Sequence, residues 1–139
     1  MMAPLHIFER VDINAIPQGL RECRAIFVTR NEAQRLPWLL RYYRGLGVDR
    51  FFVVDNGSTD GSVDFLLRQK DCHVFVTHDS YTESGFGHSW QQIVLDMYGE
   101  DNWWLIVDAD EVFVYPDSET VPLPQFTHYL DSLGAQGVS

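Results

Sequence analysis

The chain has 139 residues, of which 45% are hydrophobic and 22% charged, so we expect one folded domain rather than a disordered chain. Its net charge of −10 argues against a nucleic-acid partner held by a basic surface. No apolar run reaches the roughly 20 residues of a transmembrane segment, and the first residues lack the features of a signal peptide. Two cysteines, Cys23 and Cys72, are too few for a disulfide framework. We therefore expect a cytoplasmic protein, peripheral to a membrane only through segments outside this chain.

Charge is divided unevenly along the chain. All ten Lys and Arg residues lie at or before Lys70, whereas twelve acidic residues follow from Asp71 onward. Two interpretations of this acidic half stay open. It forms a solvated surface, or part of it holds a cation or faces a basic partner segment.

The predicted elements alternate between strands and helices after a weakly patterned start. Residues 1–24 are expected to wrap the surface as an extension of a domain over residues 25–139. Apolar runs and helical spacing then predict, in chain order, a strand at 24–29, a helix at 36–46, a strand at 51–55, a helix at 62–69, a strand at 73–77, a helix at 88–98, a strand at 103–107, an extended piece at 112–115 and a helix at about 124–133. A dense run of turn-forming residues, 56–61, separates the second strand from its helix.

This alternation is typical of an α/β fold with three layers, α/β/α, around a mainly parallel sheet. In such sheets ligands bind beyond the carboxyl ends of the strands. Polar clusters fall at three of those ends: residues 29–32, 55–60 and 108–111. We therefore expect the functional site at this edge of the sheet.

Asp108 and Asp110 are the strongest candidates for a metal site. Two positions apart at the end of a strand, they share one face, with Cα atoms roughly 6.5–7 Å apart. Their mutual repulsion, roughly 3 kcal/mol at 5 Å and an effective dielectric near 20, would be relieved by a cation. Carboxylates suit Mg²⁺ or Mn²⁺. The alternative interpretation is a pair of solvated acids in a turn.

Other candidates lie at the ends of the first two predicted strands. Asp55 can accept hydrogen bonds from a base or a ribose, or can only shape its turn. Asp60 fits an N-cap of the following helix better than a ligand. Thr29, Asn31 and Glu32 end the first strand without a glycine-rich phosphate loop, so a metal would carry much of the charge of any bound phosphate.

The sequence resembles glycosyltransferase family 2, and in particular its subgroup related to family 92. The resemblance is carried by three ordered motifs, Val28-Thr29-Arg30-Asn31-Glu32, then Val53-Val54-Asp55-Asn56-Gly57-Ser58-Thr59-Asp60-Gly61-Ser62, then Val107-Asp108-Ala109-Asp110-Glu111. It implies a Rossmann-like GT-A fold, a nucleotide-sugar donor, with a UDP-sugar favoured, and Mn²⁺ or Mg²⁺ held through the DxD motif. A glycan, a lipid-linked molecule or a protein would be the acceptor.

By the same resemblance, Asp55 would contact the base or ribose, and Asn31 and Glu32 would lie in the nucleotide pocket. Asp110 would be the main residue for the metal and the diphosphate, with Asp108 nearer the donor sugar. Thr29 completes this proposed set.

The chain departs from the family's pattern at three places. Arg30 stands where many members carry an aromatic residue, and Asn56 where many carry a second Asp. The acceptor-binding half, with its catalytic carboxylate, would lie beyond the DxD motif, so the chain resembles a donor-binding part. Inverting transfer needs a general base, and none is assigned among the later acids Asp117, Glu119 and Asp131.

Two other functions fit part of the pattern. Residues 107–112 also fit the motif of haloacid-dehalogenase-like phosphatases, with Asp108 as the nucleophile, although that family usually places the motif on its first strand. A non-catalytic nucleotide-binding module with the same fold is the third possibility.

Overall fold

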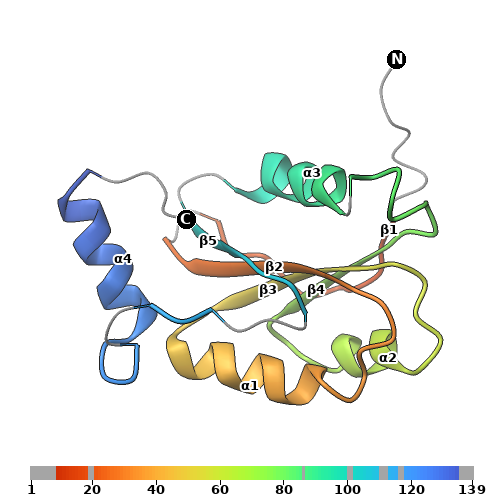
Figure 1. Ribbon diagram of the computed structural model, residues 1–139, viewed down its shortest axis with the longest axis horizontal. Coiled ribbons are helices and arrows are strands. Elements are labelled where there is room, and N and C mark those ends of the chain that lie inside the picture. The colour runs from red at the N-terminus through yellow and green to blue at the C-terminus, as the bar shows by residue number, and fades with distance from the viewer. Residues whose placement is uncertain are drawn as a thin grey trace.

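The computed structural model describes residues 9–18, 21–85, 87–99, 102–109, 113–115 and 118–134. Within these ranges five strands form one sheet in the order β1-β4-β3-β2-β5 (Figure 1). The strands are β1 (Glu9–Arg10), β2 (Cys23–Thr29), β3 (Arg50–Asp55), β4 (Cys72–Val76) and β5 (Trp103–Ile106). Strands β2 to β5 pair in parallel, and only β1 is antiparallel, against β4. The prediction of a mainly parallel sheet is confirmed.

Four helices, counted over the same residues, complete the fold: α1 (Leu36–Leu46), α2 (Ser62–Leu67), α3 (His88–Tyr98) and α4 (Leu123–Ser132). Helices α1 and α2 cover one face of the sheet, and α3 covers the other (Figure 1). Right-handed crossovers require this arrangement, because the chain moves outward from β2 to β4 and then returns past β2 to β5. The predicted α/β/α layering is confirmed.

The alternation of side chains along the strands divides the core into two clusters. Phe51 and Val53 of β3 belong to the larger cluster, under α1 and α2, whereas Phe52 and Val54 belong to the smaller one, under α3. Because both faces are covered, the parallel strands are apolar at nearly every position, as the sequence predicted. Both cysteines are buried and unpaired, which agrees with the absence of a disulfide framework.

The predicted boundaries agree with the structure to within two residues. Helix α2 ends at Leu67 rather than at residue 69, and β5 ends at Ile106. The N-cap of α2 is Gly61 and not Asp60, although the Asp60 carboxylate accepts the N–H of Ser62 at 3.0 Å. Residues 113–115, predicted as an extended piece, belong to no strand.

The sequence missed β1 and the tight attachment of the segment around it. Val11 N–H donates to Val74 O at 2.8 Å, and the side chain of Asn14 donates to the carbonyls of Gln69 and Cys72. Residues 9–14 therefore extend the sheet at its β4 edge instead of only wrapping the surface. A domain boundary at residue 25 stays a prediction.

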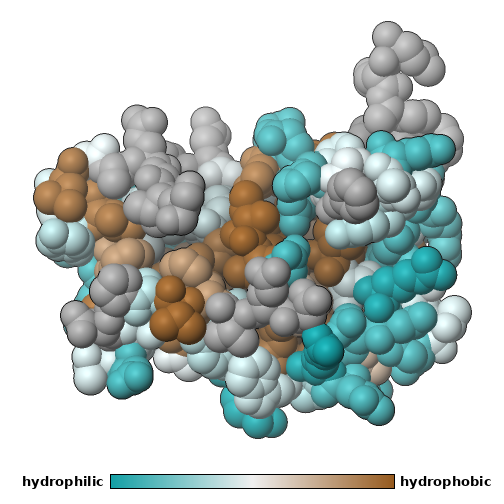
Figure 2. Space-filling model, in the orientation of Figure 1, coloured by the Kyte–Doolittle hydropathy of each residue, from teal (hydrophilic) through white to brown (hydrophobic). Residues whose placement is uncertain are grey.

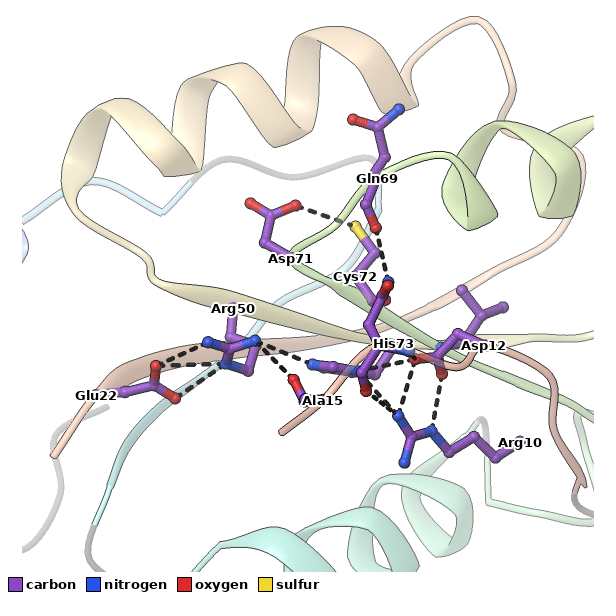
Figure 3. A network of polar contacts seen from close by, with 11 residues as sticks. Arg10, Asp12, Ala15, Glu22, Arg50, Gln69, Asp71, Cys72 and His73 are labelled. Carbon is purple, nitrogen blue, oxygen red and sulfur yellow. Dashed lines mark hydrogen bonds and ion pairs between the residues drawn. The ribbon is translucent and has the colours of Figure 1, made fainter. Parts of the chain in front are cut away.

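A buried polar network fixes this segment to the sheet (Figure 3). Asp12 accepts two hydrogen bonds from Arg10, at 2.9 Å each, and lies 3.0 Å from His73 Nδ1. Arg50 lies 3.3 Å from His73 Nε2 and forms an ion pair with Glu22. Because a guanidinium can only donate, Nε2 is the acceptor and Nδ1 carries the proton that His73 donates to Asp12.

Burial sets the protonation of the two central groups in opposite ways. Burial raises the pKa of Asp12, but hydrogen bonds from Arg10, Val74 and His73 outweigh it and lower that pKa to about 2. Burial lowers the pKa of His73, which is fully enclosed, and the hydrogen bond to Asp12 offsets only part of this effect. At neutral pH the network therefore holds a charged Asp12 and a neutral His73.

Candidate nucleotide-sugar site

The strand order identifies one place at the carboxyl edge of the sheet where a ligand is expected. Strand β2 is followed outward by β3 and β4 on one side, while β5 lies on its other side, so the strand order reverses between β2 and β5. Ligands of open α/β sheets bind at such a reversal, beyond the carboxyl ends of the strands. Thr29 ends β2 beside Asp55 at the end of β3, and Asp108 comes two residues after β5. Hydrophilic residues gather at this edge, at the right of Figure 2, whereas apolar residues show over β5.

Thr29 is the polar side chain at this edge whose bonding is incomplete. Its residue is 2% exposed, and its Oγ1 atom has no hydrogen-bond partner among the described residues. A buried hydroxyl without a partner costs about 1–3 kcal/mol, so this atom needs an explanation. A ligand that bonds to the hydroxyl would provide one.

Asp55 is held inside its own turn. It is fully buried, and its two carboxylate oxygens accept the backbone N–H of Ser58 at 2.8 Å and the Ser58 hydroxyl at 2.5 Å. A nucleotide would reach this carboxylate only after the turn opens, or through its remaining lone pairs. Direct contact between Asp55 and a base stays a prediction.

The loop after β2 and the loop after β3 are joined by three hydrogen bonds between described residues. Asn31 N–H donates to the Ser58 hydroxyl at 2.9 Å, and the Asn31 side-chain oxygen accepts the N–H of Thr59 at 2.7 Å. The Asp60 carboxylate accepts the N–H of Ala33 at 3.0 Å. Asn31 has a φ of 54°, a left-handed conformation that Asn tolerates better than most residues.

Asn56 connects these loops to the one that follows β4. Its N–H donates to Thr29 O at 2.9 Å, and its side-chain amide donates to the carbonyls of Thr77 and Asp79. The position that departs from the family pattern thus carries a structural amide, which the sequence analysis did not foresee. A carboxylate could not donate these bonds, so an Asp at this position would lose both.

Gly87, which precedes α3, lies close against β2, and residues 80–85 form the turn before it. A Cβ atom at Gly87 would lie 2.8 Å from Val28 Cγ2, and the φ of Gly87 is 88°. Ser84 fixes the segment, since its hydroxyl donates to Tyr81 O and accepts the N–H of Gly87. Val28, the residue before Thr29, therefore lies directly beside Gly87.

Glu32 and Arg30, the other polar residues after β2, are more accessible. Glu32 is half-buried and forms an ion pair of 3.4 Å with Arg35, whereas Arg30 is exposed. The backbone oxygen of Glu32 accepts from Arg35 and Leu36, and so begins the turn into α1. Glu32 can therefore reach a ligand at this edge without breaking a buried contact.

Asp108 is exposed, and Asp110 and Glu111 lie outside the described residues. Among the residues that the structure does describe, no group of three His, Cys, Asp or Glu side chains could hold a metal ion. Because Asp110 is outside the described residues, the structure gives no distance between the carboxylates of Asp108 and Asp110. Its donor chemistry, two carboxylates, fits Mg²⁺ or Mn²⁺, and an exposed Asp108 is free to bind an ion.

Of the later acids, Asp131 is excluded as a base at this edge. Its carboxylate accepts from Arg21 at 3.3 Å and from the indole N–H of Trp103 at 3.2 Å. Trp103 is the first residue of β5, so Asp131 lies at the amino ends of the strands, across the sheet from Asp108. Glu119 is exposed in a turn, and Asp117 falls outside the described residues.

A comparison with protein families adds an independent finding. The family model described as "Glycosyl transferase family 2" matches residues 25–119, more than half of the chain, and so spans all three polar clusters. The match concerns the family as a whole and does not distinguish a subgroup related to family 92. No curated protein and no solved structure matches the chain.

Proposed function

Because the chain belongs to glycosyl transferase family 2, we propose that its carboxyl-edge loops bind a nucleotide-diphosphate sugar together with Mn²⁺ or Mg²⁺. A UDP-sugar is the favoured donor. The sugar is transferred to a glycan, a lipid-linked molecule or a protein, which fits a role in polysaccharide biosynthesis.

The observation that carries this proposal is the unpaired, buried hydroxyl of Thr29 at the strand-order reversal. Thr29 O accepts the N–H of Asn56, the first residue after β3, so the main chain that carries the hydroxyl is held at this edge. A donor molecule offers ribose hydroxyls and base N–H groups that can complete such a site. We propose that the pocket consists of Thr29, Asn31, Glu32, Asp55 and Asp108.

The metal would be held by Asp110 and Asp108. When bound, it supplies positive charge to the diphosphate, which is the leaving group of sugar transfer. The two carboxylates would hold that charge, and Asp108, whose side chain is exposed, would lie nearer the donor sugar. We assign no general base.

No observation favours the two alternative functions. In a phosphatase of the haloacid-dehalogenase type, Asp108 would attack a phosphate ester directly. In a non-catalytic module, the loops would bind a nucleotide without cleaving the sugar from it. Hydrolysis of a generic phosphate ester would support the first, and donor binding without any turnover in the presence of acceptors the second.

Calorimetry on the chain tests the proposal. UDP and GDP are titrated in Mn²⁺ and again in EDTA. We expect binding of at least one of them with the metal and none without it. Equal binding in EDTA would contradict the metal bridge, and no binding under either condition would contradict the nucleotide site.

Within the described residues, no helix has both the length and the apolar character to cross a membrane.

A further inference from the structure

Asp60 connects two parts of the carboxyl edge through different oxygen atoms. Its Oδ1 accepts the N–H of Ser62 at 3.0 Å and the Ser62 hydroxyl at 2.5 Å, so this oxygen completes the turn of Asp60's own loop. Its Oδ2 accepts the N–H of Ala33 at 3.0 Å, in the loop after β2. The carboxylate of Asp60 thus bonds within its own loop through Oδ1 and to the loop after β2 through Oδ2.

The loop that Asp60 reaches carries proposed ligand residues. Ala33 is the neighbour of Glu32 and lies two residues after Asn31. Upstream, Asn31 bonds to Ser58 and Thr59, so the cross-loop contacts run along the loop from residue 31 to residue 33. Asp60 supplies the last of them, immediately before the turn that enters α1.

The contact needs an acceptor that stays unprotonated. Hydrogen bonds from Ser62, and then from Ala33, lower the pKa of Asp60. The side chain is exposed, so the three donors, and not burial, hold the carboxylate in its charged form. At neutral pH both oxygens are therefore available as acceptors.

We infer that Asp60 is a positioning residue. Its hydrogen bond with Ala33 N–H holds the loop after β2 against the loop after β3 and so positions Asn31 and Glu32 for nucleotide binding. This role rests on the proposed function, because its readout is the affinity for the nucleotide. Asp60 itself contacts no ligand in this scheme. It acts through the backbone of Ala33.

Substitution Asp60→Asn separates the bonds made by Oδ1 from the bond made by Oδ2. An amide has one acceptor oxygen, so, whichever way it is turned, one of the two backbone N–H groups loses its acceptor. When the oxygen stays on the Ser62 side, two bonds survive there, and the amide N–H₂ faces the N–H of Ala33. The cross-loop bond is then lost and replaced by a repulsive contact between two donors.

Ser62→Ala is the matched control. It also removes one hydrogen bond from the Asp60 carboxylate, but it leaves the Ala33 bond in place. Ser62 is not among the proposed ligand residues. A purely structural Asp60 predicts that the two variants lose thermal stability to a similar degree and that the folded protein binds the nucleotide normally in both.

The experiment measures dissociation constants for UDP and GDP in Mn²⁺ well below the melting temperature, together with hydrogen exchange of amides 31–35. We expect Asp60→Asn to weaken binding roughly fivefold, the equivalent of one hydrogen bond of about 1 kcal/mol, and to speed exchange in the loop. Ser62→Ala should change neither.

Two results would overturn the inference in distinguishable ways. If the wild-type chain binds neither nucleotide, the proposed function fails, and the positioning role fails with it. If the wild-type chain binds a nucleotide and Asp60→Asn binds it equally well, only the positioning role of Asp60 is wrong. Faster exchange without weaker binding has the same meaning, because it shows that the loop can open without cost to the site.

Discussion

The two ends of the sheet use the same kinds of residue in opposite ways. At the amino ends, Asp12 is buried, Arg50 and Glu22 are partly buried, all three charges are paired, and His73 is bonded through both ring nitrogens (Figure 3). At the carboxyl ends, the Thr29 hydroxyl has no hydrogen-bond partner among the described residues, and Asp108 forms no ion pair with any of them. Complete pairing marks a polar cluster that stabilises the fold, whereas incomplete pairing marks a place that a ligand completes.

We expect the largest change in the free energy of unfolding from a substitution in the network around Asp12, at the amino ends of the strands. Asp12→Asn turns an amide N–H₂ toward groups that now donate to a carboxylate, among them Val74 N–H and Arg10. Because Arg10 is partly exposed, the cost comes mainly from leaving buried donors such as Val74 N–H without an acceptor, about 1–3 kcal/mol. We expect the free energy of unfolding, measured in urea, to fall by that amount.

Asp131→Asn serves as the control for this variant. Asp131 pairs with Arg21, whose side chain is 65% exposed, so its ion pair contributes less than about 1 kcal/mol. Equal losses in the two variants would show that the network around Asp12 is no stronger than an exposed ion pair.

At the other end, Asp110→Asn should weaken metal-dependent nucleotide binding at least tenfold, about 1.4 kcal/mol. The substitution keeps the size of the side chain and removes the charge that attracts the ion. Stability in EDTA should stay equal or rise, since repulsion with Asp108 is relieved. Thermal melting in EDTA beside a UDP titration in Mn²⁺ measures both quantities. A less stable variant whose folded fraction binds normally would remove Asp110 from the site.

Thr29→Val tests the carboxyl ends of the strands by removing one atom, the Thr29 hydroxyl oxygen. Valine keeps the shape of threonine and removes the unpaired hydroxyl, so the free energy of unfolding should rise by about 1 kcal/mol. Nucleotide binding should weaken several-fold, because the ligand loses a partner. Thr127→Val is the matched control: its hydroxyl donates to Pro124 O at 3.0 Å, and its removal should destabilise the fold. Destabilisation by both variants would assign Thr29 to the fold alone.

The smallest effect concerns pH. Since the pKa of His73 is lower in the folded protein than its ordinary value of 6.5, the unfolded chain binds a proton more readily. Stability is therefore complete above that value and is lost as pH falls through it toward the folded pKa. Between pH 7 and pH 6 the loss due to this group should be less than about 1 kcal/mol.

His73→Gln tests the assignment of this pH effect. Glutamine keeps a donor and an acceptor but does not titrate. The variant should lose part of the dependence of unfolding free energy on pH between 7 and 6. An unchanged pH profile would show that another group is responsible.

Most of the sheet could be predicted because its signals are local. Apolar runs such as residues 51–55 and helical spacing such as 36–46 need no knowledge of distant residues. Strand β1 could not be predicted, because Glu9 and Arg10 are polar and are paired only through residues 75 and 76 of β4. The partner of Asp12, His73, is likewise 61 positions away.

The neighbouring positions of two candidate residues were predictable, but the hydrogen bonds around them were not. The topology brings Thr29 and Asp55 together, as the sequence indicated. The spacing could not reveal that Asp55 is turned onto Ser58, or that the amide of Asn56 joins two loops. Such hydrogen bonds depend on side-chain rotamers and loop geometry, which a residue pattern does not encode.

The antiparallel strand β1 also has a consequence for the order of events during synthesis. Glu9 and Arg10 pair with Val76 and Phe75, which are added to the growing chain more than 60 residues later. At about 5–20 residues per second, this delay lasts roughly 3–13 s. A strand that waits so long unpaired would invite aggregation if it were apolar. The charges of Glu9, Arg10 and Asp12 keep the nascent segment solvated until its partner strand exists.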